Sequence, residues 1–413
     1  MAGAGSKCPL EVRVRRVPGA PVVAARLWLW GGSRLEETPG LGLLTGRLLS
    51  EGTRRRDYRA ISREAEDRGM LVQSYASTDA LGVSIEALAV DWPRVLDWIV
   101  ELTLEPTFPE DRQQWSCRQA AAELESLYDQ GDFRALWTFL DQIYHPHPYG
   151  RPALGHPRSL ATITPDDCVA LHRRALAWGG CLVVAGDVDE GQVGGRLESL
   201  LADWPVAPEA RPEVPQPVGR GETRTTVAIP PGDQAHLHLG HHTLCRTDPD
   251  LPALDVLAII LGAGSSLSGR LPLRIRDEEG LAYQVDVTAT GGAGLDPGRL
   301  GIYVGTSPST VDRAEGLVRE ELRRLLDDGV TDAELTDAKA FLVGRDPFRR
   351  ETARQWADLM AESALYGLPV DDPDWVARTV ATLDRGDLAR VAERWLRPDD
   401  LRVTVGLPDS KTG

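Results

Sequence analysis

The two halves of the chain repeat one pattern of helices and strands, and this repetition limits the possible folds more than any other feature. A helix pattern over 91–102, a proline-containing turn and a second helix from about 110 to 127 return later as a helix pattern over 311–326, a turn and a helix that starts at Asp332. Asp111 and Asp332 are 221 positions apart at equivalent helix starts. We therefore expect two copies of one folding unit.

Both halves also close in the same way. A helix pattern that starts at Pro165 leads into a strand ending at Gly186, and one that starts at Arg385 leads into a strand ending at Gly406. The two glycines are 220 positions apart, which is nearly the spacing of the helix starts. The repeat therefore extends to the end of each half.

A proline-rich stretch separates the halves. Residues 201–224 contain five prolines and show neither a helical nor a strand period, which is typical of an ordered linker. At roughly 150 residues per domain, 413 residues permit two or three domains. The sequence predicts a first domain over 1–205, a linker over 206–222 and a second domain over 223–413.

The apolar pattern indicates the fold class. Residues 22–30, 73–87 and 300–304 alternate with period two, which predicts antiparallel sheets with one covered face. The helices come in runs and do not alternate strictly with strands. We expect an α+β fold of two tandem homologous domains, each an antiparallel sheet packed with helices.

Charge and cysteine content exclude several classes of protein. The chain has 46 basic and 62 acidic residues, a net charge of -16 that repels phosphate backbones and anionic lipids. We expect no nucleic acid or membrane partner, although a basic peptide is compatible. The five cysteines form no C-x-x-C pair, and no segment approaches the roughly 18 apolar residues of a membrane helix. A cytoplasmic location is expected.

The segment 31–53 carries the first family signature. It contains Gly-Ser-Arg-Leu-Glu at 32–36 and Gly-Thr at 52–53. This frame resembles the pitrilysin/insulinase family of zinc metallopeptidases, in which it encloses an H-x-x-E-H motif with two zinc-binding histidines and a general base. Here Leu43, Gly46 and Arg47 occupy those positions. Leucine and glycine cannot ligate zinc and arginine is a permanent cation, so no zinc is expected in this chain.

The family's other first-domain residues are partly retained. Its third zinc ligand is a glutamate that maps onto Glu123, 76 positions after Arg47. Alone it makes no zinc site, and we expect a structural role, with an ion pair to Arg47 as one possibility. The family's substrate-accepting strand has asparagine and alanine where this chain has Gln73 and Ser74. Substrate binding in the first domain is therefore not expected.

The second half keeps a longer family block over 261–283. It resembles the segment G-G-x-S-S-R-L-x-x-x-I-R-E-x-x-G-L-A-Y, whose arginine and tyrosine hold the substrate peptide, and these map onto Arg276 and Tyr283. A guanidinium and a phenol can bind a peptide carbonyl or stabilise an oxyanion. Alternatively, Arg276 pairs with Asp277 or Glu279 and Tyr283 is an ordinary strand aromatic. A phosphate loop is not expected, since G-K-[ST] is missing.

Four histidines at 236, 238, 241 and 242 form the remaining cluster. On a strand, His236 and His238 share one face, so a metal site is conceivable. No carboxylate or cysteine stands at ligand spacing, and alternation with leucines also fits a plain strand. The sequence leaves metal binding by these histidines open.

The family resemblance covers nearly the whole chain and implies a specific role. A lost zinc motif beside an intact Arg/Tyr block resembles the zinc-free subunit of a heterodimeric bacterial peptidase, similar to the non-catalytic chain of processing peptidases. It implies a clamshell of two domains, inactive alone, beside a zinc-bearing homologous subunit, with a peptide or unfolded protein segment as substrate. The alternatives are a scaffold or assembly subunit, and a self-sufficient hydrolase that uses the 236–242 histidines.

Overall fold

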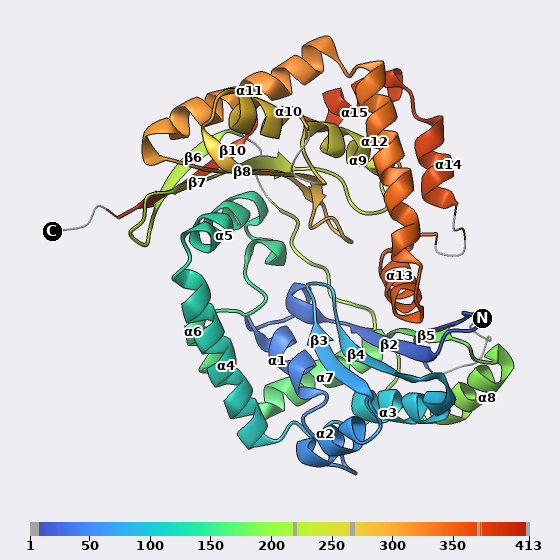
Figure 1. Ribbon diagram of the computed structural model, residues 1–413. Coiled ribbons are helices and arrows are strands. Elements are labelled where there is room, and N and C mark those ends of the chain that lie inside the picture. The colour runs from blue at the N-terminus through green and yellow to red at the C-terminus, as the bar shows by residue number, and fades with distance from the viewer. Residues whose placement is uncertain (1–7, 218–220, 265–268, 370–371, 373, 410–413) are drawn as a thin grey trace. The chain divides into compact units, whose positions relative to one another are not determined.

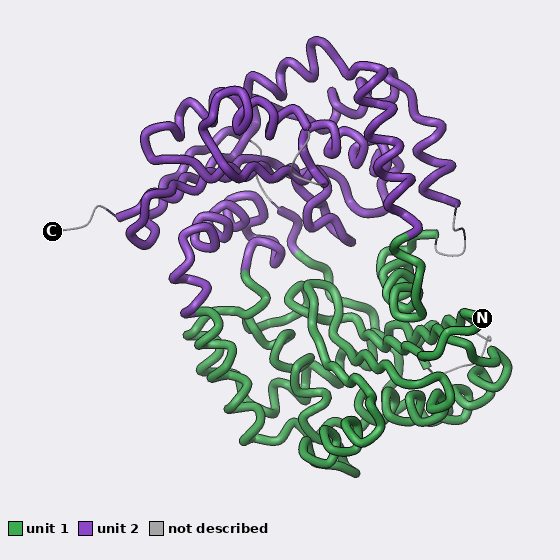
Figure 2. The backbone as a smooth tube through the Cα atoms, in the orientation of Figure 1, with its two compact units in different colours: residues 1–124, 152–214, 348–370 green, residues 125–151, 215–347, 371–413 purple. Residues whose placement is uncertain are grey.

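The chain forms two compact units, each assembled from separate stretches of sequence (Figure 2). The computed structural model describes residues 8–217, 221–264, 269–369, 372 and 374–409. The first unit comprises residues 1–124, 152–214 and 348–370, and the second comprises 125–151, 215–347 and 371–413. Each is a five-stranded sheet packed with helices, which confirms the predicted α+β class (Figure 1). The division at 205 and 223 stays a prediction about the sequence repeat.

The first sheet has the order β1-β5-β2-β4-β3, and only β1 and β5 run parallel. Its strands are β1 (Leu10–Arg16), β2 (Val22–Trp30), β3 (Leu71–Ala76), β4 (Ala80–Leu88) and β5 (Gly180–Gly186). The helices from this part of the sequence are α1 (Leu41–Leu48), α2 (Tyr58–Glu66), α3 (Trp92–Leu104), α4 (Glu110–Tyr128), α6 (Pro157–Leu160), α7 (Pro165–Trp178) and α8 (Glu190–Leu200).

The second sheet has the order β6-β10-β7-β9-β8, with β6 and β10 as its parallel pair. Its strands are β6 (Thr223–Ile229), β7 (Ala235–His242), β8 (Ala282–Gly291), β9 (Arg299–Thr306) and β10 (Arg402–Pro408). The helices from this part of the sequence are α9 (Leu251–Leu261), α10 (Arg270–Pro272) with a π-helical turn over Leu273–Glu278, α11 (Val311–Asp328), α12 (Asp332–Arg345), α14 (Trp375–Thr382) and α15 (Arg385–Trp395).

The predicted repetition is confirmed in the strand order, which is the same in both sheets when each strand is numbered within its half. Equivalent helices also begin alike. The α7 helix starts at a capping box formed by Thr164 and Asp167, and α15 starts at one formed by Asp384 and Asp387. Such boxes satisfy backbone N–H groups that the first helical turn leaves unpaired. Thr164 and Asp384 are 220 positions apart, which matches the spacing found in the sequence.

Each sheet is also covered by one helix from the other half of the sequence. The α13 helix (Ala353–Tyr366) packs on β2 and β5 of the first sheet, and α5 (Gly131–Tyr144) packs on β6, β7 and β10 of the second. Ala24 and Trp28 of β2 pack with Trp356 and Met360 of α13 in one buried cluster. The compact units are therefore discontinuous in sequence.

The prediction that each sheet has only one covered face was wrong for β2. This strand is buried along both faces, because α13 covers one face while α3 and α7 pack on the other side of the strand. Single-sided burial does occur in the edge strand β8, where exposed and buried residues alternate. The continuous alternating run predicted over 73–87 is a hairpin of β3 and β4 with its turn at 77–79.

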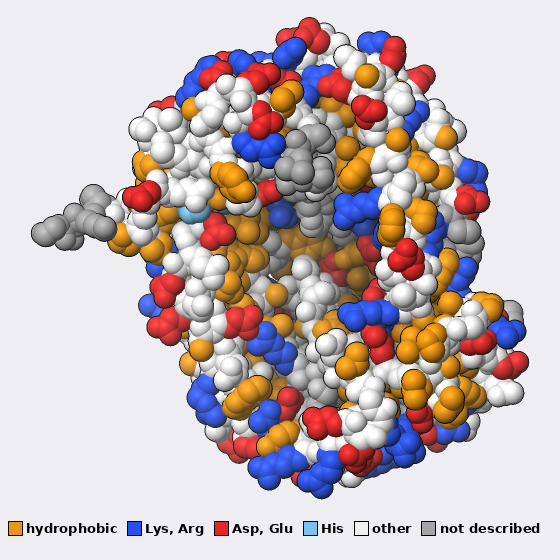
Figure 3. Space-filling model, viewed as in Figure 1, with side chains coloured by type: hydrophobic (Ala, Val, Ile, Leu, Met, Phe, Trp, Pro, Cys, Tyr) orange, Lys and Arg blue, Asp and Glu red, His pale blue; other side chains and the backbone are white. Residues whose placement is uncertain are grey.

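The surface of the described residues carries both signs of charge. Acidic and basic side chains are interspersed on each unit in the face that Figure 3 shows. Among the described helices, none combines the length and apolar composition needed to cross a bilayer.

Candidate functional site

The degenerate motif lies on α1, which packs against neighbouring backbone through two glycines. A Cβ atom on Gly46 would lie 2.5 Å from the carbonyl oxygen of Tyr75, and one on Gly42 would lie 2.5 Å from the carbonyl carbon of Gly32. Real Cβ atoms do not approach so closely, so α1 is seated where only glycine fits. The position of the family's general base therefore has no room for a glutamate side chain.

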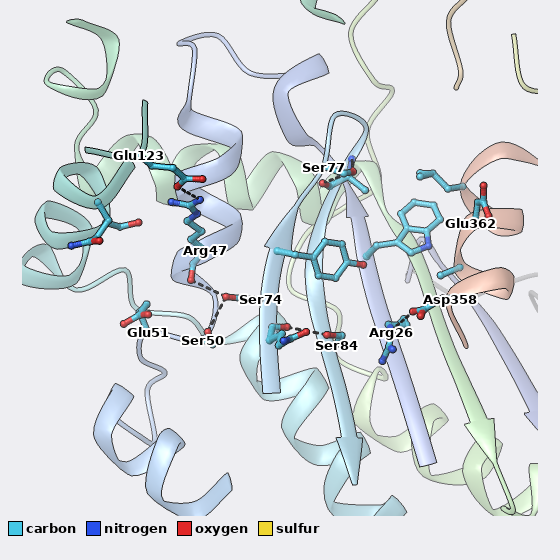
Figure 4. A pocket seen from close by; sticks show the side chains of 18 of the residues that line it. Arg26, Arg47, Ser50, Glu51, Ser74, Ser77, Ser84, Glu123, Asp358 and Glu362 are labelled. Atoms are coloured by element: carbon cyan, nitrogen blue, oxygen red, sulfur yellow. Dashed lines mark hydrogen bonds and ion pairs between the residues drawn. The ribbon is translucent and has the colours of Figure 1, made fainter. Parts of the chain in front are cut away.

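An ion pair takes the place of the zinc ligands. Nη2 of Arg47 lies 2.8 Å from Oε2 of Glu123 on α4, and the two side chains point toward one another (Figure 4). The expected pairing is thereby confirmed. The hydroxyl of Ser74 on β3 donates to the carbonyl oxygen of Arg47 at 2.8 Å and lies 2.8 Å from the hydroxyl of Ser50. These bonds fix the end of α1 against β3.

These residues do not fit a zinc ion. A guanidinium held against Glu123 repels a divalent cation and blocks the carboxylate, while Leu43 and Gly46 offer no donor atom. Among the described residues, no group of three or more His, Cys, Asp or Glu side chains is placed to hold a metal. No chemical step can be derived through zinc at α1.

A pocket of about 1110 Å³ opens beside this ion pair, within the first unit. Its floor comes from β2, β3 and β4, and its walls from α1, α4 and α13. On the α13 side, Arg26 is held by two carboxylates. Its Nε lies 2.6 Å from Asp358 (Figure 4), and its Nη2 lies 2.8 Å from Glu86. This partly buried pair was missed in the sequence because Arg26 and Asp358 are 332 positions apart.

Arg276 lies in the π-helical turn that precedes β8. Its Nε and Nη2 donate to the two carboxylate oxygens of Asp277 at 2.8 and 3.3 Å, so one of the expected alternatives for Arg276 is present. Asp277 raises the pKa of Arg276 through its hydrogen bond and its charge, and Tyr283 contributes a smaller part of the shift. Residues 265–268 of the family block lie outside the described residues.

Tyr283 sits at an irregularity of the edge strand. Ala282 pairs with Thr306 and Gln284 pairs with Gly305, so Tyr283 is an extra residue in the ladder. Such bulges redirect side chains and are common beside functional sites. Tyr283 is 92% exposed, the most exposed of the large hydrophobic side chains in the described residues.

The four histidines lie on β7 and have different surroundings within the second unit. Nδ1 of His236 lies 2.9 Å from the Tyr303 hydroxyl, and Nε2 of His241 accepts from the backbone N–H of Arg397 at 3.1 Å. Burial lowers the pKa of His238 to about 3 and those of His241 and His242 to about 4. With pKa values this low, His238, His241 and His242 are neutral near pH 7.

Comparison with known proteins agrees with this geometry. A repeated α+β unit with a degenerate metal motif is typical of an inactive metallopeptidase homologue. Such a homologue fits the role of a non-catalytic subunit. The family model "Insulinase (Peptidase family M16)" matches residues 12–155, and the model "Peptidase M16 inactive domain" matches residues 181–342. The chain belongs to the insulinase family, peptidase family M16.

Individual relatives cover most of the chain. An uncharacterized zinc protease of Streptomyces coelicolor is 27% identical over 97% of this chain and 89% of its own length. The non-peptidase homolog YmxG of Helicobacter pylori is 26% identical over 83% of this chain and 78% of its own. A peptidase M16 inactive domain structure from Pseudomonas fluorescens shares the fold, with a TM-score of 0.89, 24% identity and 97% coverage of both chains.

Proposed function

We propose that this chain is the non-zinc-binding subunit of a heterodimeric zinc metallopeptidase, and that Arg276 and Tyr283 bind the substrate peptide in the active site of a zinc-bearing homologous partner. The cofactor is the partner's zinc. The substrate is a peptide or an unfolded protein segment, and the complex acts in the cytoplasm.

The exposure of Tyr283 carries this proposal. A bulge at the edge of a sheet holds the ring in solvent, and a large exposed aromatic contributes little to the core of its own unit. Edge strands bind extended peptides through main-chain hydrogen bonds, and β8 is the edge of the second sheet. A phenol beside a guanidinium can donate to a carbonyl oxygen or to the oxyanion that forms from it.

The ion pair with Asp277 is compatible with that role. The side chains of Arg276 and Asp277 are 22% and 45% exposed, so the pair is partly solvated. Exposed pairs of this kind contribute little to stability, because water screens their attraction. A peptide carbonyl or oxyanion can therefore recruit the guanidinium at small cost.

The relatives support a chain that acts beside a peptidase. Their names include zinc proteases, a non-peptidase homolog and, at 22% identity, a probable mitochondrial-processing peptidase subunit beta of Arabidopsis thaliana. A relative named as a non-peptidase homolog agrees with a zinc-free role, and those named as zinc proteases agree with a zinc-bearing partner.

The test uses the full chain with and without its zinc-bearing partner. Alone, the chain is expected to hold no stoichiometric zinc and to cleave no peptide. In the complex, Arg276→Ala and Tyr283→Phe should each lower turnover at least ~100-fold, the scale of losing a donor to a developing oxyanion. Arg274→Ala is the matched control, since Arg274 lies in the same turn and pairs with Glu278 at 2.8 Å.

Turnover within twofold of the unmodified complex for both variants would refute the shared-site role. If assembly stays intact in that case, the scaffold or assembly function is favoured. Co-sedimentation of the two chains measures assembly separately from activity.

A further inference from the structure

A smaller pocket lies on the second sheet beside α5, within the second unit. It has a volume of about 300 Å³, with a floor of β7, β8 and β9 and a wall from α5. Ligand pockets span roughly 300–1,000 Å³. This pocket is at the lower end of that range and has room for a single amino-acid side chain.

The repeat allows the pocket to be compared with the first unit, position by position. In the first sheet, Gly82 lies opposite Trp28, and Arg26 lies opposite Ser84. In the second sheet, β7 and β9 are the counterparts of β2 and β4. Gly301 of β9 lies opposite Gly240 of β7, as Gly82 of β4 lies opposite Trp28 of β2.

Two positions before Gly240 on β7 is His238, which lies opposite Tyr303. His238 therefore holds the register position that Arg26 holds in the first unit. The side chains also face equivalent helices, since Arg26 bonds to Asp358 of α13 and the ring of His238 stacks on Phe139 of α5 with centroids 5.7 Å apart.

The first unit fills this position with its own cation. The Arg26 side chain is only 7% exposed, and its guanidinium is bound by Glu86 and Asp358 at 2.8 and 2.6 Å. Burial of a guanidinium requires such carboxylates. In the second unit the shorter imidazole leaves open space at the same place.

Carboxylates are nevertheless present around the second pocket. Asp132 of α5 and Asp286 of β8 both line it. Burial, with smaller contributions from the charges of Asp132 and Asp286, raises the pKa of Tyr303 to about 12. Arg299 also lines the pocket: its Nη1 donates to the carbonyl oxygen of Gly291 at 3.2 Å, and its positive charge adds to the burial that lowers the pKa of His238.

His238 supplies an independent observation. It is 7% exposed, and its Nε2 has no hydrogen-bond partner among the described residues. Leaving a buried polar group without a hydrogen bond is unfavourable, because its lost hydration is not replaced. The neutral ring does not cancel the charge of the carboxylates, and with Tyr303, 5.0 Å away between centroids, it offers aromatic surface to a cation.

We propose that this pocket binds the arginine side chain of a peptide, with the guanidinium held by Asp132 and Asp286 against the rings of Tyr303 and His238. A planar guanidinium suits both contacts, since it binds carboxylates in a forked geometry and stacks on aromatic faces. The bound arginine takes the place that Arg26 fills in the first unit.

The pocket is close in sequence to the proposed substrate-binding tyrosine. Gln284 and Asp286 follow Tyr283 on β8, and all three are exposed while Val285 and Val287 are buried. Asp286 is three residues from Tyr283, which corresponds to about 10 Å along a strand. This inference rests on the proposed function for the peptide class of the ligand, and it adds which side chain is selected.

The test measures peptide binding to the full chain alone by isothermal titration calorimetry. The probes are blocked nine-residue peptides of serine and alanine with one central arginine, lysine or citrulline; citrulline has the same shape without the charge. The arginine peptide is expected to bind at least tenfold more tightly than the citrulline peptide. Asp286→Asn should remove this difference, and Tyr303→Leu should weaken binding while Tyr303→Phe keeps it.

The matched control is Asp337→Asn, which removes the same charge from an exposed position on α12. The proposal is overturned if the arginine and citrulline peptides bind equally, if neither binds at millimolar concentration, or if Asp337→Asn weakens binding as much as Asp286→Asn. Because neither partner nor cleavage enters the assay, failure of the Arg276 and Tyr283 proposal leaves its outcome unchanged.

Discussion

Placing a methyl group on Gly46 tests whether α1 is held by close backbone contact. In Gly46→Ala, the new Cβ would lie 2.5 Å from the oxygen of Tyr75 and 2.7 Å from the Cβ of Ala76, whereas ordinary contacts begin near 3.4 Å. A carbonyl in a paired strand cannot rotate away, so α1 must move by nearly 1 Å. Overpacking of this kind costs ~1–3 kcal/mol.

The helix gains something in return, since alanine is favoured over glycine in a helix interior by ~1 kcal/mol. The net loss is then about 0–2 kcal/mol, which lowers the thermal midpoint by up to about 8 °C for a unit of this size. Gly194→Ala in α8 is the matched control, because a Cβ there meets no atom within 4 Å. It should leave the midpoint unchanged or raise it.

Differential scanning calorimetry of both variants gives the comparison directly. If the thermal midpoint of Gly46→Ala equals or exceeds that of the control Gly194→Ala, then α1 is not confined by β3. The explanation given for the absent glutamate would then be wrong.

Two further perturbations probe the first unit. Arg47→Glu should lower the free energy of unfolding by about 0.5–1 kcal/mol through repulsion from Glu123, and adding Glu123→Arg should restore it. If the two substitutions instead cause additive losses in urea titrations, the ion pair is contradicted. His172 is buried with Nε2 2.7 Å from the Thr103 oxygen, and burial lowers its pKa to about 4. Since the unfolded group titrates near pH 6.5, its stabilising contribution is complete above that pH and is lost as the pH falls toward 4. Between pH 7 and 5 the loss is about 2 kcal/mol, and His172→Gln should flatten the pH dependence of unfolding by that amount.

Local patterns predicted much of the fold. The helices over 165–178 and from 110 were found because an N-cap or a proline marks their starts and apolar residues recur with the helical period. The repeat followed from two similar offsets. The turn at 77–79 was missed because it is short and the alternation of β3 continues into β4.

Contacts between distant segments could not be predicted in this way. The positions of α5 and α13 depend on pairing with strands from the other half of the chain, and no local period encodes that choice. For the same reason the ion pair between Arg26 and Asp358 could not be predicted from local patterns. The Arg47–Glu123 pair was accessible only because a family resemblance placed both residues at one site.

The placement of α13 also orders events during synthesis of the chain. The ribosome completes all five strands of the first sheet by residue 186, yet the helix that covers Ala24 and Trp28 ends only at residue 366. An apolar face of the nascent first sheet therefore stays uncovered while some 180 further residues are synthesised. At ~5–20 residues per second this synthesis takes roughly 9–36 s. The second sheet has no such delay, because α5 has already emerged before its first strand. Chaperone dependence should accordingly concentrate in the first half of the chain, even though its own sequence is finished first.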